Sequence, residues 1–252
     1  MAASRGADVV LVPGFMQGAR SWAGVLEHMG RRYRALALEH RAHDFEGRLA
    51  EIEAAGAEGA VLVGYSLGGR LALHAALRAA ERPGRFGGLV TLGVSAGIED
   101  PEERERRRVA DLELAAWIER SPIQAVVERW ERVPALAGQP PQLVRAQRRD
   151  RLAQDPARLA ELLRSAGQGA LAPVWVRLPS LSMPVLALAG ARDAPYVAAA
   201  ERIAAIASRA GAAVVPRAGH AAHLERPSAF AGALLEFLDE HLGERRLVDL
   251  DA

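Results

Sequence analysis

The chain of 252 residues contains no cysteine and no lysine, few aromatic residues and no long apolar run. Without cysteine there can be no disulfide bond and no thiolate metal site, which excludes a disulfide-stapled secreted scaffold. No apolar run approaches the roughly 18 residues of a membrane-spanning helix, and residues 1–8 contain no apolar core of a signal peptide. These absences predict a soluble, cytoplasmic protein.

The charge balance excludes a second group of functions. All 32 basic residues are arginine and oppose 31 acidic residues, so the net charge is only +1. Such a balance gives no overall field that would attract nucleic acid or an anionic membrane, and we expect neither as a partner. Because the exclusive use of arginine looks like a coding bias, arginine is weaker evidence for anion recognition here than in a lysine-containing chain.

What the sequence does contain is a regular alternation of apolar strand-like runs and helical stretches. We expect strands at residues 8–12, 33–39, 60–63, 88–94, 184–189 and 213–215, and helices at 21–29, 45–55, 68–80, 197–210 and 227–242. Strands that alternate with helices predict an α/β fold with a mostly parallel sheet and right-handed crossovers.

One long segment breaks this alternation. Residues 100–178 are polar and helical and show no convincing strand. Prolines at 101, 122, 134, 140, 141 and 156 punctuate the segment, which indicates four or five short helices. We therefore divide the chain into an α/β core of residues 1–96 and 180–252 and an inserted helical cap of residues 97–179. Residues 245–252 are expected to form a loose tail.

The most informative motif is Gly64-Tyr65-Ser66-Leu67-Gly68, a G-x-S-x-G pattern between an apolar strand and an Ala/Leu-rich helix. A serine at the apex of such a sharp turn adopts a strained backbone, so its neighbours two positions away must lack bulk. The turn presents the Ser66 hydroxyl as a nucleophile or base. The competing interpretation is an ordinary glycine-rich turn.

A serine hydroxyl is weak unless an imidazole accepts its proton, and the imidazole in turn needs a carboxylate. In the architecture that carries a G-x-S-x-G turn between strand and helix, both are expected on loops after late strands, in the order Ser, acid, His. Asp193 and His220 occupy those positions and are the predicted partners of Ser66. Asp193 could instead cap the helix that follows it, His220 could be a loop residue without a catalytic role, and His223 could replace it.

The remaining candidates would surround this centre. The backbone amides of Phe15 and Leu67 are expected to form an oxyanion hole, although residues 13–15 could equally be a plain Pro-Gly turn. Arg70 could face the floor of a pocket or pair with an acid on its own helix. The other histidines show no metal-ligand spacing, so we expect no metal and no cofactor.

Several segments together resemble those of the 2-succinyl-6-hydroxy-2,4-cyclohexadiene-1-carboxylate (SHCHC) synthase family of menaquinone biosynthesis, within the α/β-hydrolase superfamily. The resemblance covers about residues 8 to 240, cap included. Its segments are Gly64-Tyr65-Ser66-Leu67-Gly68-Gly69-Arg70, Ser95-Ala96-Gly97-Ile98-Glu99-Asp100, Arg149-Asp150-Arg151-Leu152-Ala153-Gln154-Asp155-Pro156, Gly190-Ala191-Arg192-Asp193 and Arg217-Ala218-Gly219-His220-Ala221-Ala222-His223.

The resemblance implies a lyase on a hydrolase fold, which removes a ring proton and eliminates pyruvate from an enolpyruvyl group. It implies that Ser66 acts as a base, activated by His220 and Asp193, and that no acyl-enzyme forms. It also implies a small carboxylate substrate, a monomer or homodimer, and a set of substrate-binding residues. These are Tyr65, Arg70, Arg107, Trp130 and Arg151.

Two segments depart from the family pattern. The family usually has His-Gly-Phe where this chain has Pro13-Gly14-Phe15, and an Asp with a Gly-His-Gly turn where this chain has residues 39–44. Both segments are expected at the pocket rim, so they bear on the substrate more than on the fold. Two other functions remain open at this point: a serine hydrolase acting on an ester, lactone or carbon-carbon bond, and a catalytically silent binding protein.

Overall fold

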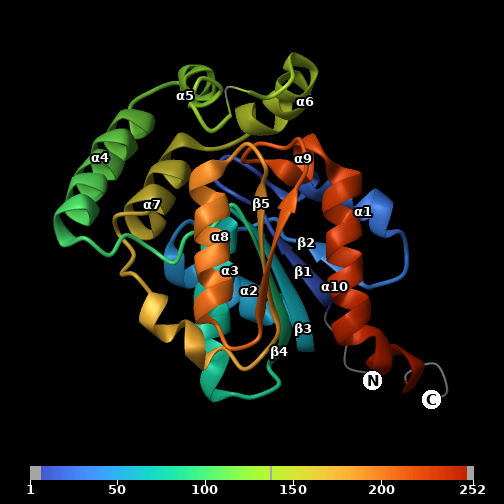
Figure 1. Ribbon diagram of the computed structural model, residues 1–252. Coiled ribbons are helices and arrows are strands. Elements are labelled where there is room, and N and C mark those ends of the chain that lie inside the picture. Colours follow the sequence, from blue (N-terminus) through green and yellow to red (C-terminus); the bar gives the residue numbers. More distant parts are fainter. Residues whose placement is uncertain (1–6, 137, 249–252) are drawn as a thin grey trace, which may run out of the picture.

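The computed structural model describes residues 7–136 and 138–248 and is built around a sheet of six strands (Figure 1). The strands lie in the order β2-β1-β3-β4-β5-β6, and every neighbouring pair is parallel. Their bounds are Ala7–Val12 (β1), Ala35–Ala37 (β2), Gly56–Tyr65 (β3), Phe86–Leu92 (β4), Val185–Gly190 (β5) and Ala210–Val215 (β6). The predicted parallel α/β fold is therefore confirmed.

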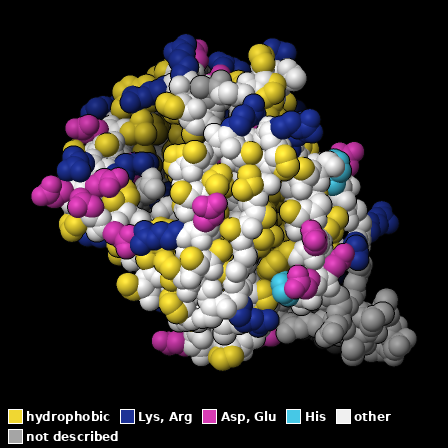
Figure 2. Space-filling view, in the orientation of Figure 1, with side chains coloured by type: hydrophobic (Ala, Val, Ile, Leu, Met, Phe, Trp, Pro, Cys, Tyr) yellow, Lys and Arg dark blue, Asp and Glu magenta, His cyan; other side chains and the backbone are white. Residues whose placement is uncertain are grey.

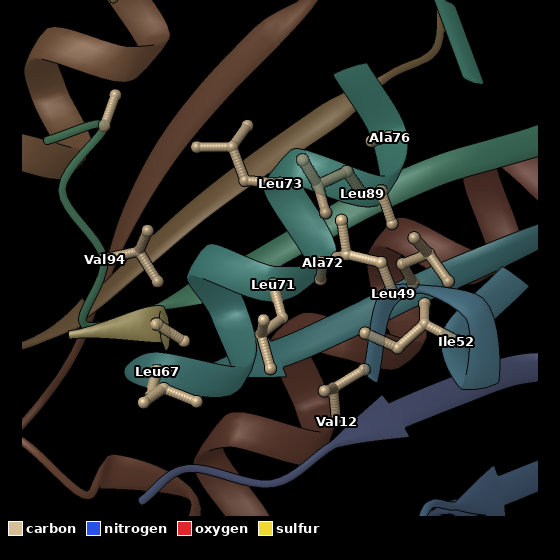
Figure 3. Close-up of a cluster of buried hydrophobic side chains, with 14 of the residues drawn as sticks. Val12, Leu49, Ile52, Leu67, Leu71, Ala72, Leu73, Ala76, Leu89 and Val94 are labelled. Atoms are coloured by element: carbon tan, nitrogen blue, oxygen red, sulfur yellow. The ribbon is translucent and has the colours of Figure 1, made fainter. Parts of the chain in front are cut away.

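Helices cover both faces of the sheet (Figure 1). The core helices are α1 (Ala23–Met29), α2 (Phe45–Ala55), α3 (Leu67–Arg78), α8 (Ala194–Ile206), α9 (Ala222–Glu225) and α10 (Pro227–Val248). One apolar cluster packs α2, α3 and α8 against one face, and a second packs α1 and α10 against the other. Figure 3 shows the first cluster, in which Leu71 and Ala72 of α3 meet Leu49 and Ile52 of α2. Each fully buried leucine contributes about 1.5–3 kcal/mol.

The helical cap lies between β4 and β5 in the chain and extends beyond one end of the sheet (Figure 1). Its helices are α4 (Pro101–Glu119), α5 (Ile123–Trp130), α6 (Pro141–Leu152) and α7 (Pro156–Ala166), followed by the short 3₁₀ helix η3 (Trp175–Ser180). Buried residues of α4 and α7 belong to the same apolar cluster as α2 and α3. Figure 2 shows charged side chains gathered along the outer edge of α4. The cap thus shares its core with the sheet below it.

Several expectations about element bounds were wrong. β3 and β6 are longer than expected, and α8 begins and ends earlier than expected, at Ala194 and Ile206. The second strand has only three residues and pairs with β1 alone. The first cap helix, α4, has 19 residues and is not short, since the next proline comes only at Pro122. The expected tail begins later, because α10 continues to Val248; residues 249–252 lie outside the described residues. Within the described ranges, no helix is both long and apolar enough to span a membrane.

Candidate active site

Ser66 stands at the junction of β3 and α3 in a strained backbone conformation. Its φ of 51° and ψ of −117° place it where a non-glycine residue is rare. The glycines around it have no room for a side chain. A Cβ on Gly64 would lie 2.5 Å from the Cα of Gly69, and one on Gly68 would lie 2.3 Å from the carbonyl oxygen of Pro13. The close packing of β1, β3 and α3 therefore fixes the serine at the turn.

A chain of two hydrogen bonds joins Ser66 to His220 and Asp193. The Nε2 atom of His220 lies 3.0 Å from the Ser66 hydroxyl, and its Nδ1 atom lies 2.6 Å from Oδ2 of Asp193. If Nδ1–H donates to the carboxylate, Nε2 is left to accept the serine proton. The arrangement can therefore withdraw a proton from Ser66 and stabilise the imidazolium that results.

The positions of Asp193, His220 and His223 distinguish between the alternatives for the acid and the histidine. Asp193 does occupy the N-cap position of α8, but its carboxylate makes no capping hydrogen bond and instead contacts His220. His223 is buried behind the site, with its ring 4.3 Å from that of Tyr65 and neither ring nitrogen hydrogen-bonded within the described residues. Burial lowers the pKa of His223 to about 3. His220, and not His223, is thus placed to accept the proton of Ser66.

A cavity opens beside the Ser66 hydroxyl, between the sheet and the cap. Six of the predicted site residues line it: Phe15, Ser66, Leu67, Arg70, Arg107 and Trp130. The ring of Phe15 meets that of Trp130 edge-on, with centroids 5.1 Å apart. Core and cap therefore both contribute walls to one cavity that contains the serine.

Two arginines bring positive charge into this cavity from opposite sides. Arg70, one turn into α3, has a buried Nη1 atom with no hydrogen-bond partner among the described residues. Burial lowers the pKa of Arg70 to about 10, so the guanidinium stays charged at neutral pH. Arg107 of α4 is held by Asp111 through Nε at 2.8 Å and by Gln168 through Nη1 at 2.7 Å. An anionic ligand in the cavity would accept a hydrogen bond from the unpartnered Nη1 of Arg70.

Two of the predicted substrate-binding residues lie outside the cavity lining. Tyr65 is buried beneath the site, where its ring packs against His220 and His223. Arg151 is 2% exposed, and its guanidinium donates to Gln147 at 2.8 Å and to Glu131 at 3.4 Å. This placement indicates that both residues support the side chains that line the cavity.

Sequence reasoning missed Tyr196 and Asp111, which also line the cavity. The ring of Tyr196 lies 4.7 Å from that of His220, and burial raises the pKa of its hydroxyl. Its position three residues after Asp193, on the first turn of α8, was the available signal. Asp111 follows Arg107 by four residues, a spacing that places both on one helix face. Among the described residues, no group of three or more His, Asp or Glu side chains could hold a metal ion.

The segments that depart from the family pattern contact the elements beside the site. Glu39 accepts a hydrogen bond from the amide of Ala19 at 2.9 Å, and Asp44 caps α2 through the amide of Gly47 at 2.9 Å. His40 contacts Glu51 at 2.7 Å, and burial lowers the pKa of His40 to about 4. These contacts give the altered residues structural roles at the ends of β2 and α2.

Comparisons with known proteins show the family to which the chain belongs. The model of the family described as "Alpha/beta hydrolase family" matches residues 9–233. A relative from Bacillus subtilis (strain 168) is 32% identical over 180 residues, which are 70% of this chain and 65% of that protein. A protein of Escherichia coli O1:K1 / APEC named 2-succinyl-6-hydroxy-2,4-cyclohexadiene-1-carboxylate synthase is 32% identical over 181 residues, 70% of this chain and 67% of its own length.

The fold has a close counterpart among solved structures. MenH from S. aureus superposes with a TM-score of 0.82, covers 96% of both chains and is 24% identical in sequence. At that identity the likeness supports the fold, and the sequence relatives support the family. This chain is therefore an enzyme that belongs to the alpha/beta hydrolase family, within which it is similar to the SHCHC synthases.

Proposed function

We propose that this enzyme is a carbon-oxygen lyase that converts 2-succinyl-5-enolpyruvyl-6-hydroxy-3-cyclohexene-1-carboxylate to SHCHC and pyruvate. The observation that carries the proposal is the pair of arginines in the Ser66 cavity, of which Arg70 has a buried, unpartnered guanidinium nitrogen. The substrate has several carboxylates, and guanidinium groups bind carboxylates through charge-assisted hydrogen bonds. The name of the Escherichia coli relative identifies the same reaction product.

In the proposed reaction, Ser66 acts as a base. As its hydroxyl proton passes to Nε2 of His220, the serine oxygen takes a proton from a ring carbon of the substrate. The electron pair of that C–H bond forms one ring double bond, the ring double bond already present shifts by one carbon, and the bond between the ring and the enolpyruvyl oxygen breaks. Pyruvate leaves as its enolate, which then takes up a proton. Asp193 stabilises the imidazolium throughout, and the amides of Phe15 and Leu67 would bind developing negative charge.

The test is to supply the substrate, made in situ, and to follow pyruvate release and product absorbance. We expect Ser66→Ala to lower kcat by about 10²- to 10⁴-fold, as removal of a general base does. Arg107→Ala should lower kcat/KM by about tenfold to a hundredfold, since it removes a charged hydrogen-bond donor. Arg106→Ala is the matched control, because Arg106 is on the same helix, is exposed and pairs only loosely with Glu102 at 3.7 Å.

One outcome would replace this proposal with the hydrolase alternative. If pyruvate release does not exceed the spontaneous rate, while a simple ester is cleaved in a manner that depends on Ser66, the serine attacks carbonyl carbon. Accumulation of an acyl-enzyme would identify that chemistry directly. The same hydrogen-bonded residues serve both reactions, so the substrate and the intermediate distinguish them.

A further inference from the structure

Glu225, the last residue of α9, places its carboxylate between the two loops that carry Asp193 and His220. Its side chain is only 5% exposed. The Oε2 atom accepts a hydrogen bond from the amide of Gly219 at 2.8 Å and another from Nη2 of Arg192 at 3.0 Å. One carboxylate oxygen therefore connects both loops.

The two donors are the immediate neighbours of the acid and the histidine. Arg192 precedes Asp193, and Gly219 precedes His220. The backbones of the same loops also meet, because the amide of Arg192 donates to the carbonyl of Ala218 at 2.9 Å. A Cβ on Gly190 would lie 2.0 Å from the carbonyl oxygen of Gly219, so the loops are in direct contact. Glu225 hydrogen-bonds to both loops where they contact each other.

We propose that Glu225 is a positioning residue that holds the Asp193 loop and the His220 loop at hydrogen-bonding distance. The 2.6 Å contact between Asp193 and His220 depends on the relative position of two loops from different strands. A buried carboxylate with two donors is well satisfied, and charge-assisted hydrogen bonds restrain both partners. The inference rests on the proposed catalytic use of Ser66, His220 and Asp193, but not on the identity of the substrate.

The experiment compares Glu225→Gln, Arg192→Ala and Arg192→Lys with Glu201→Gln, an exposed residue of α8, as the control. We expect Glu225→Gln to lower kcat by about tenfold to a hundredfold with little change in KM, because small displacements of catalytic groups cost rate. Arg192→Ala should lower kcat by about threefold to tenfold. Arg192→Lys should restore most of it, because Arg192 uses a single nitrogen that an ammonium can replace.

A second measurement needs no substrate. The downfield proton resonance of Nδ1–H in His220 reports its hydrogen bond to Asp193, and we expect exchange broadening of this signal in Glu225→Gln and Arg192→Ala. In Glu225→Gln, adding Arg192→Ala should have less than about a twofold further effect on kcat, since both act through one contact.

A wild-type resonance and wild-type kcat in Glu225→Gln would overturn the inference. A lower melting temperature with unchanged resonance and kcat would also overturn it, because it would assign Glu225 to stability alone. Failure of the proposed reaction is distinguishable: pyruvate release would then be absent from the wild-type enzyme, while the resonance would still respond to Glu225 and Arg192.

Discussion

Arg70 keeps a positive charge in a place where folded proteins usually remove or pair one. Its Nη1 atom is buried without a partner among the described residues, and burial lowers its pKa only to about 10. Arg70 as a whole is half-buried, and a partly buried charge without a partner lowers the free energy of unfolding unless a ligand compensates it. At the scale of single residues, this conflict between stability and binding is the clearest sign of an anion site.

Replacing Arg70 with methionine should therefore stabilise the fold of the free enzyme and lower its catalytic efficiency. We expect Arg70→Met to raise the free energy of unfolding by about 1 kcal/mol or more, while kcat/KM falls by about tenfold to a hundredfold. Thermal unfolding and steady-state pyruvate release measure the two effects. Arg78→Met is the control on the same helix, since Arg78 is exposed and pairs with Glu46. A lower melting temperature for Arg70→Met would show that its charge is already compensated.

His223 gives a prediction about pH. Burial, helped by the charge of His220, lowers the pKa of His223 from 6.5 to about 3. The folded protein then keeps this imidazole neutral, while the unfolded chain takes up a proton below about pH 6.5. His223 therefore makes its full contribution to the free energy of unfolding above that pH. The contribution falls by about 1.4 kcal/mol for each pH unit below it.

His223→Leu should remove this dependence. As the pH falls from about 7.5 to 5.5, the free energy of unfolding of the wild-type protein should decrease by about 1.4 kcal/mol more than that of the variant, because the other titrating groups are common to both. Urea unfolding at each pH measures this difference. Leucine fits the apolar surroundings formed by Trp22 and Phe230, so the variant should fold at neutral pH. Equal pH dependence in the two proteins would show that His223 can be protonated in the folded state.

At the scale of elements, the junction of β3 and α3 depends on the absence of side chains. A Cβ on Gly64 would meet the backbone of α3 at 2.5 Å, and backbone cannot give way as a flexible side chain can. The strained Ser66 is held in place by this contact between strand and helix. The requirement is local, because a glycine elsewhere, Gly232 of α10, has open space where its side chain would be.

Gly64→Ala should consequently lower the free energy of unfolding by about 3 kcal/mol or more and abolish turnover. Gly232→Ala in α10 is the matched control, because its added Cβ meets nothing within 4 Å. That control should be stabilised by about 0.5–1 kcal/mol, as alanine is the better helix former. Urea unfolding measures both, and equal stability of the two variants would show that the junction is not closely packed.

At the scale of the whole molecule, we expect the cap and the sheet to unfold as one cooperative unit. Leu159 and Ala160 of α7 belong to the same buried cluster as Val12 of β1 and Leu71 of α3. Because this apolar core crosses the boundary between cap and sheet, loss of either part exposes the other.

Leu159→Ala should therefore lower the melting temperature of the entire protein by roughly 5 to 15 °C, given about 2–5 kcal/mol for a buried leucine. Calorimetry should still show one transition, with the calorimetric enthalpy equal to the van't Hoff enthalpy. Val109→Ala serves as the control, because Val109 is 43% exposed on α4. Two separate transitions in the wild-type protein would contradict cooperative folding.

Most of the sheet could be predicted from the sequence because strands buried on both faces are continuous apolar runs. Ser66, Asp193 and His220 could be predicted because the order of strands places their loops at one edge. The placement of Arg151 could not, since it depends on Glu131, twenty residues away and on another part of the cap. The division at residues 97 and 179 stays a prediction.

Arg107 and Trp130 enter the cavity from the segment between β4 and β5, whereas Ser66, Asp193 and His220 lie on the segments that follow β3, β5 and β6. Substitutions in the cap can therefore alter which molecule is held without touching the residues that move the proton. Selectivity and chemistry can evolve at different rates in such a chain. A laboratory search for new substrates should accordingly begin on the cavity side of α4 and α5.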